Sequence, residues 1–119
     1  NQLIGHILFS PVSIETEHGT EYGMGLAPMA VHPEFQRQGI GSQLVEQGLA
    51  ELAARHVPFV IVLGHPDYYP RFGFVPASRY GIRCQWEGVP DEAFMIRLLD
   101  EAIGTKLQGT AYYRQEFTL

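Results

Sequence analysis

The chain has 119 residues, of which 45% are hydrophobic and 18% are charged, a composition typical of one soluble globular domain. Eight basic residues against thirteen acidic ones give a formal net charge of -5, the wrong sign for a domain that binds a nucleic-acid backbone. No apolar run approaches the roughly 18 residues that cross a bilayer, and Cys84, the single cysteine, excludes an intrachain disulfide. We therefore expect one cytoplasmic domain, residues 1–119, that binds neither nucleic acid nor membranes.

The first part of the chain is typical of β-structure. Residues 2–14 are rich in β-branched and apolar types and predict one strand or a bent pair of strands. Residues 15–25 are polar and contain glycine, which predicts a turn leading into a second strand at about Met24–Val31. Because proline cannot donate a hydrogen bond to a ladder, Pro28 predicts a bulge or a missing partner in that strand.

An amphipathic helix is predicted to begin at Ile40, since apolar residues recur at steps of three and four as far as Ala53. Pro58 ends this pattern, and the unbroken apolar run Phe59–Leu63 predicts a strand buried on both faces. The succession of strand, helix and strand predicts a right-handed crossover and a parallel pair of strands. Further short strands are predicted at Phe74–Pro76, at Phe94–Leu99 and, as a last one, at Ala111–Phe117.

Two glycines, Gly39 and Gly41, stand where this helix begins, although each weakens a helix by about 1 kcal/mol. The N–H groups of a first helical turn lack partners and carry the positive end of the helix dipole, so they attract anions. Missing Cβ atoms let a bulky anion approach, which favours a pyrophosphate cradle formed by the amides of residues 37–41, with Arg37 adding charge. The alternative is that the glycines only end a turn and allow a close helix crossing.

The two common nucleotide patterns are not met. The dinucleotide fingerprint requires a third glycine where Leu44 stands, and the triphosphate loop requires Gly-Lys-Ser/Thr. The expected anion therefore belongs to neither NAD nor ATP.

The run Gln36-Arg37-Gln38-Gly39-Ile40-Gly41 matches the Gln/Arg-x-x-Gly-x-Gly/Ala signature of the GNAT superfamily of N-acetyltransferases. The stretch LAPMAVHPEF before it resembles that family's fourth strand, and VIVLGHPDYYPRFGFVPA resembles its fifth strand, short helix and following Gly-Phe. The resemblance covers residues 3 to about 99. Within the family, the chain is similar to a bacterial subgroup of predicted N-acetyltransferases. The family's N-terminal strand and helices are expected to be absent from it. It implies an α/β acyl-CoA N-acyltransferase fold: a mixed, mostly antiparallel sheet with a central parallel strand pair splayed around the CoA groove and helices packed on it.

The resemblance also implies a chemistry. Acetyl-CoA is the expected cosubstrate, and the acetyl group passes directly to a primary amine of a small molecule or a protein, with no metal and no covalent intermediate. Cys84 is then expected to be a buried structural thiol. The expected coenzyme-binding residues are Met29, Ala30, Val31, Gln36, Arg37, Gln38, Gly39, Ile40, Gly41 and Ser42.

Tyr69 is the expected catalytic residue, because it stands four residues before Gly73-Phe74, where the family's general-acid tyrosine falls. It would donate a proton to the leaving thiolate, as a well-placed donor or with a lowered pKa. One of the adjacent Tyr68 and Tyr69 is expected to pack against the sheet instead.

No general base is transferred from the family, because the positions that carry its carboxylate are occupied here by Ala27 and Pro28. Glu21, His6 and His32 are candidates by residue type only.

Two alternatives to an enzyme remain open. The chain could be a non-catalytic CoA-binding module that has lost its acceptor site, or a domain for another phosphorylated ligand. The amine acceptor is not predicted, since the family builds that side of the groove from the segment expected to be absent. An edge strand exposed by that absence favours a homodimer.

Overall fold

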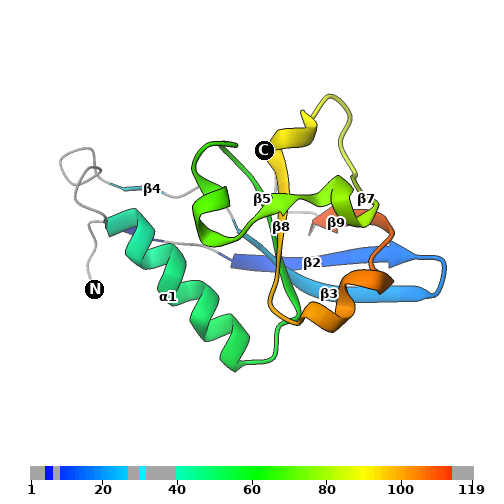
Figure 1. Ribbon diagram of the computed structural model, residues 1–119, viewed down its shortest axis with the longest axis horizontal. Helices are drawn as coiled ribbons and strands as arrows, with labels where there is room; N and C mark the ends of the chain where they lie inside the picture. The colour runs from blue at the N-terminus through cyan, green and yellow to red at the C-terminus, as the bar shows by residue number, and fades with distance from the viewer. Residues whose placement is uncertain (1–4, 7–8, 27–29, 32–39, 114–119) are drawn as a thin grey trace.

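The computed structural model describes residues 5–6, 9–26, 30–31 and 40–113 (Figure 1). Its strands are β1 (Gly5–His6), β2 (Phe9–Thr16), β3 (Gly19–Leu26), β4 (Ala30–Val31), β5 (Phe59–Leu63), β6 (Val75–Pro76), β7 (Ile82–Cys84), β8 (Phe94–Leu98) and β9 (Gly109–Tyr113). Its helices are α1 (Ile40–Ala54) and the short 3-10 helices η2 (Tyr69–Phe72), η3 (Ala77–Tyr80), η4 (Asp91–Ala93) and η5 (Glu101–Lys106).

Seven of the strands form one mixed sheet, with the order β6-β8-β5-β3-β2-β9-β7. Neighbouring strands are antiparallel except for the pairs β3/β5 and β7/β9. The first parallel pair is the one predicted on either side of the helix. The mostly antiparallel sheet with a central parallel pair is therefore confirmed.

The first hairpin corrects the prediction of a turn over residues 15–25. Strands β2 and β3 are paired from Phe9↔Leu26 to Thr16↔Gly19, and only residues 17–18 form the turn. Gly23 and Gly25 in this stretch are strand residues at close approaches and not turn residues. A Cβ on Gly23 would lie 2.6 Å from the Phe59 ring. The missing side chain is needed for packing, and composition alone does not distinguish this role from a turn.

The two parallel strands separate at one end. Pairing of β3 with β5 covers three positions and ends at Leu26↔Val62. The chain is next described in β4, which pairs with β1 in a separate two-stranded sheet. Within the described residues β4 has no pairing with β5, so the splayed pair is confirmed. Of the predicted second strand, residues 24–26 belong to β3 and residues 30–31 to β4, and Pro28 lies outside the described residues.

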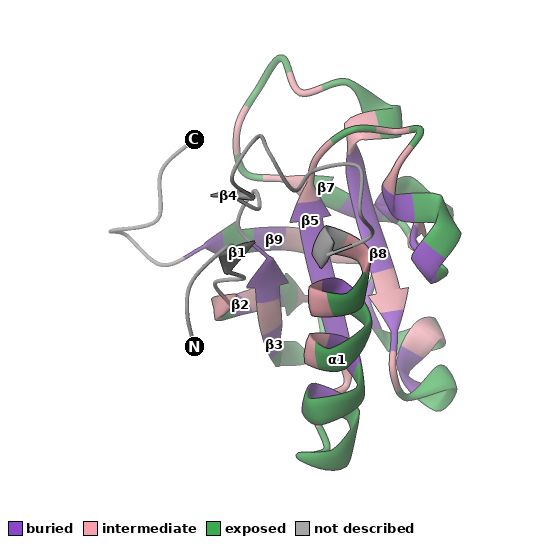
Figure 2. Cartoon of the chain, turned by 90° about the vertical axis from the view of Figure 1, so that its left-hand side faces the viewer, coloured by how far each residue is buried: buried purple, intermediate pink, exposed green. Residues whose placement is uncertain are grey.

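Helix α1 begins at Ile40 as predicted and covers one face of the sheet. Figure 2 shows its exposed side turned outward, while the strands behind it are buried. The core on this face joins α1 and η2 to the sheet and comprises Leu26, Val45, Leu49, Leu52, Val60, Val62, Tyr69, Phe72, Phe74 and Met95. A second core lies on the opposite face and includes Ile14, Phe59, Ile61, Ile96 and Tyr113.

The remaining predicted strands are also present, and all but the first of them have shifted ends. Phe59–Leu63 is β5, with four of its five residues buried, and Phe94–Leu98 is β8. The last predicted strand is observed as Gly109–Tyr113, and residues 114–119 lie outside the described part. Among the described residues, no helix is long and apolar enough to cross a membrane.

Candidate active site

The first turn of α1 and strand β4 lie at the same end of the molecule (Figure 1). Of the predicted coenzyme-binding residues, Ala30 and Val31 form β4, and Ile40, Gly41 and Ser42 open α1. The first turn of α1 contains no acidic residue, so no carboxylate within it opposes the positive end of the helix dipole. The other predicted coenzyme-binding residues lie outside the described part of the chain: Met29, Gln36, Arg37, Gln38 and Gly39.

Tyr69 opens the short helix η2, which follows the carboxyl end of β5. Its side chain is buried, and its ring packs edge-to-face against Phe74 with 5.8 Å between ring centroids. The ring lies directly on the backbone of Gly64, where a Cβ atom would overlap its edge. Burial, and to a smaller extent the neighbouring Tyr68, raise the pKa of Tyr69 above its ordinary value. Of the two alternatives for Tyr69, this environment favours a protonated hydroxyl over a lowered pKa.

Tyr68 connects η2 to the first turn of α1. Its hydroxyl lies 3.4 Å from Oγ of Ser42, and its ring stands edge-to-face on Tyr69 with 5.0 Å between centroids. The Arg71 guanidinium lies 4.8 Å from the centroid of the Tyr68 ring. The structure thus brings two predicted site residues, Ser42 and Tyr69, to either side of Tyr68. Sequence reasoning assigned Tyr68 no contact with α1, because spacing alone does not fix the direction of a side chain in a one-turn helix.

The candidates for a general base are not gathered at this end. Glu21 is half-buried on β3, opposite Ile14 of β2. At about 3.4 Å per residue, it lies about 17 Å along β3 from Leu26, where β3 and β5 separate. His6 belongs to β1, and His32 lies outside the described residues.

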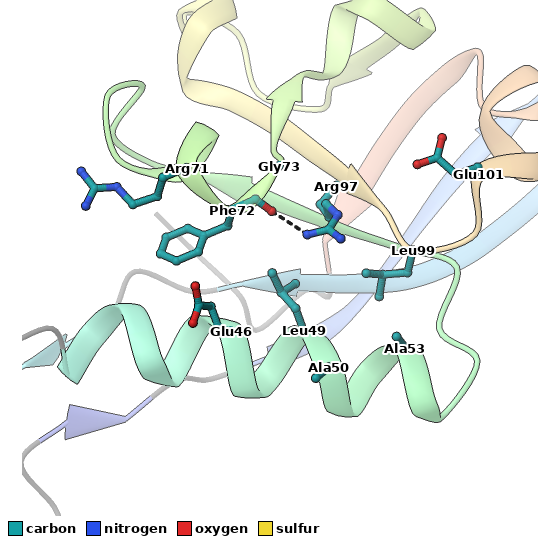
Figure 3. Close-up of a pocket in the computed structure, with 10 residues that line it drawn as sticks. All are labelled: Glu46, Leu49, Ala50, Ala53, Arg71, Phe72, Gly73, Arg97, Leu99 and Glu101. Carbon is teal, nitrogen blue, oxygen red and sulfur yellow. Dashed lines mark hydrogen bonds between the residues drawn. The ribbon is translucent and has the colours of Figure 1, made fainter.

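A groove of about 650 Å³ runs between α1, η2 and the end of β8 (Figure 3). We call it the α1–η2 groove; it is lined by Glu46, Leu49, Ala50, Ala53, Arg71, Phe72, Gly73, Arg97, Leu99 and Glu101. Two carboxylates and two guanidinium groups therefore border an apolar floor. Sequence reasoning missed this groove, because its lining comes from elements that only tertiary packing brings together.

Cys84 ends β7 and is half-buried. Burial raises the pKa of its thiol, which disfavours the thiolate needed for nucleophilic attack. The thiol is less buried than expected from the sequence, and its raised pKa favours a structural role over a reactive one. Among the described residues no cluster of His, Cys, Asp and Glu could hold a metal ion.

Comparison with known protein families shows which family this chain belongs to. The model of the acetyltransferase (GNAT) domain matches residues 1–76. The chain belongs to the GNAT family. The acyl-CoA N-acyltransferase fold expected from the glycine motif is thereby confirmed together with the family.

The GNAT relatives include proteins of known structure. The chain is 38% identical over 117 residues to YhbS of Escherichia coli, an uncharacterized N-acetyltransferase, over 98% of this chain and 68% of YhbS. The crystal structure of E. coli YhbS in complex with CoA matches with a TM-score of 0.88 and 34% identity, over 99% of this chain and 66% of that chain. A GNAT acetyltransferase from Brucella melitensis in complex with acetyl-CoA matches with a TM-score of 0.62 and 33% identity, over 82% of this chain and 51% of that chain. This chain spans about two thirds of the length of YhbS.

Proposed function

We propose that this protein is an N-acetyltransferase that transfers an acetyl group from acetyl-CoA directly to a primary amine. The observation that carries the proposal is the separation of β4 from β5 beside the first turn of α1, with Tyr69 at the carboxyl end of β5. Crystal structures of relatives that hold CoA or acetyl-CoA support the choice of cosubstrate.

The described residues fit an extended coenzyme with a doubly charged diphosphate. Strand β4 pairs with β1 along one edge, and within the described part no strand pairs with its other edge. The backbone groups of Ala30 and Val31 on that edge suit the amides of pantetheine. The N–H groups of the first turn of α1, where Gly41 carries no Cβ, suit the diphosphate.

The reaction requires two proton movements. The neutral amine nitrogen attacks the thioester carbonyl carbon, the new C–N bond forms, and the C–S bond breaks. The amine releases a proton to solvent, and the leaving sulfur takes one. We assign the donation to the hydroxyl of Tyr69, which is protonated at neutral pH and whose pKa is raised further by burial. The phenol is then restored from solvent, and the products are an N-acetylated amine and CoA thiol.

Release of CoA thiol over a panel of primary amines tests this function. Wild-type protein is expected to release thiol only when both acetyl-CoA and a suitable amine are present. Binding of acetyl-CoA without release over any amine would instead favour the non-catalytic CoA-binding module.

Tyr69→Phe tests the assigned donor. It is expected to lower kcat by about 100-fold or more, with KM for acetyl-CoA little changed, because the hydroxyl acts only as the C–S bond breaks. Tyr68→Phe is the matched comparison, since it removes the neighbouring hydroxyl that contacts Ser42. A large loss of kcat in Tyr68→Phe with none in Tyr69→Phe would reject the assignment.

A further inference from the structure

Arg97 connects strand β8 to the end of η2. Its Nη1 donates a hydrogen bond to the carbonyl oxygen of Phe72 at 2.6 Å (Figure 3). Phe72 is the last residue of η2, and the carbonyl groups at the end of such a short helix have no partner within the helix. Arg97 is half-buried, and a charged donor in this setting makes a stronger hydrogen bond than a neutral one.

The same side chain lies across Gly73. Gly73 has a left-handed backbone, with φ of 89°, and its N–H donates to the carbonyl of Pro70. A Cβ on Gly73 would lie 3.1 Å from Cδ and 3.2 Å from Nε of Arg97. The guanidinium thus reaches Phe72 over a residue without a side chain. The closing turn of η2 is in this way attached to the sheet by one arginine.

This attachment acts on the segment that carries the proposed proton donor. Tyr69 opens the same single turn, with Gly64 beneath its ring and Arg97 at the far end of the turn. A second arginine, Arg71, donates to the carbonyl of Tyr68, but its side chain is exposed and it belongs to η2 itself. Of the two, only Arg97 ties η2 to the sheet.

We propose that Arg97 is a positioning residue, whose hydrogen bond to Phe72 holds the Tyr69 hydroxyl where it protonates the leaving thiolate. The proposal rests on the function proposed above. Arg97 also lines the α1–η2 groove, so a direct contact with coenzyme is the competing role. The two roles differ in the kinetic constant that they change: positioning acts on kcat, and coenzyme binding acts on KM.

The kinetic test uses Arg97→Met, which keeps a flexible unbranched stem and removes the donors, and Arg97→Lys, which keeps a charge and a donor. We expect Arg97→Met to lower kcat at least about tenfold with KM for acetyl-CoA within about twofold, and Arg97→Lys to recover part of the loss. Arg83→Met is the control, because Arg83 is exposed on β7 and is expected to leave both constants unchanged. An increase in KM without a loss of kcat would overturn the proposal.

A double-mutant cycle separates positioning from a general structural effect. If Arg97 acts through Tyr69, Arg97→Met causes no further loss of kcat in the Tyr69→Phe background. Losses that multiply would show that Arg97 acts independently of Tyr69 and would also overturn the proposal.

A measurement that needs no acetyl transfer completes the test. In protein labelled with 3-fluorotyrosine, the ¹⁹F resonance of Tyr69 is identified by its absence from Tyr69→Phe. We expect Arg97→Met to shift or broaden this resonance in folded protein, and Arg83→Met to leave it in place. An unmoved resonance contradicts the positioning role. If Arg97→Met moves the resonance but the wild-type protein acetylates no amine, the structural step is supported and the proposed function alone is rejected.

Discussion

Gly64 and Tyr69 are in contact because the aromatic ring lies where the side chain of residue 64 would otherwise be. Gly64→Ala is therefore expected to displace Tyr69, lower kcat and reduce the free energy of unfolding by about 1–3 kcal/mol. Gly48→Ala is a matched control, since Gly48 lies on α1 and its new methyl group would meet the ring of Phe9 on β2 instead of the Tyr69 ring. Steady-state assays of thiol release measure kcat, and urea denaturation measures the free energy of unfolding. A normal kcat in Gly64→Ala would show that the position of Tyr69 is unimportant.

The protonation state of Tyr69 gives a second prediction at this scale. Burial raises its pKa above 10.0, so the hydroxyl keeps its proton throughout the neutral range. The loss of kcat that reports ionisation of this phenol is therefore expected above pH 10 in the wild type and is absent from Tyr69→Phe. A profile of kcat against pH measures this. A Tyr69-dependent loss centred below pH 10 would contradict the assigned environment.

The residue scale is also where the sequence was least informative. The spacing before Gly73-Phe74 selected Tyr69, but it gave no sign of the contacts that surround it. Arg97 lies 28 positions further along the chain and belongs to no local motif. Such a partner is fixed by the register of β8 against its neighbours, and that register is set by tertiary packing.

Helix α1 is held by its buried face. Leu52 is 8% exposed on that face, while Gln47 is exposed on the opposite side. Leu52→Ala is expected to reduce the free energy of unfolding by about 2–5 kcal/mol, because it leaves a cavity beneath the helix. Gln47→Ala is expected to change it by less than about 0.5 kcal/mol. Urea denaturation of the two variants measures the difference, and equal effects would contradict the packing described.

At the scale of elements, strong patterns were sufficient and ambiguous ones were not. The periodicity after Ile40 and the apolar run Phe59–Leu63 predicted α1 and β5 closely, because burial dominates both. The first hairpin was missed because Gly23 and Gly25 read as turn residues, although packing requires them inside a strand. Short 3-10 helices such as η2 span too few residues to produce a periodic pattern.

At the scale of the whole molecule, buried tyrosines make stability depend on pH. Burial raises the pKa of Tyr113, which packs on Trp86, and of Tyr69. Their unfolded forms ionise near pH 10 while the folded forms still hold their protons, so the unfolded state binds fewer protons there. The contribution of the two tyrosines to the free energy of unfolding is thus complete below about pH 10. It is lost as the pH rises through their pKa values in the folded protein. Urea unfolding between pH 8 and 11 is expected to show this decrease, and a flat profile would contradict it.

The order of the strands could be predicted from the sequence only through the family resemblance. Local patterns predicted β3 and β5 as a parallel pair, but they gave no reason for β9 to lie between β2 and β7. Such long-range pairings depend on the combined burial of both faces of the sheet. The α1–η2 groove follows from the same packing, and its charged border was not visible in the sequence.

The central claim is that the diphosphate of acetyl-CoA binds the first turn of α1. Isothermal titration calorimetry with wild-type protein and Gly41→Glu tests it most directly, since a glutamate places bulk and negative charge against the bound anion. We expect wild type to bind acetyl-CoA but neither NAD nor ATP, and Gly41→Glu to remain folded without measurable binding of acetyl-CoA. Unchanged affinity for acetyl-CoA in Gly41→Glu would contradict the account.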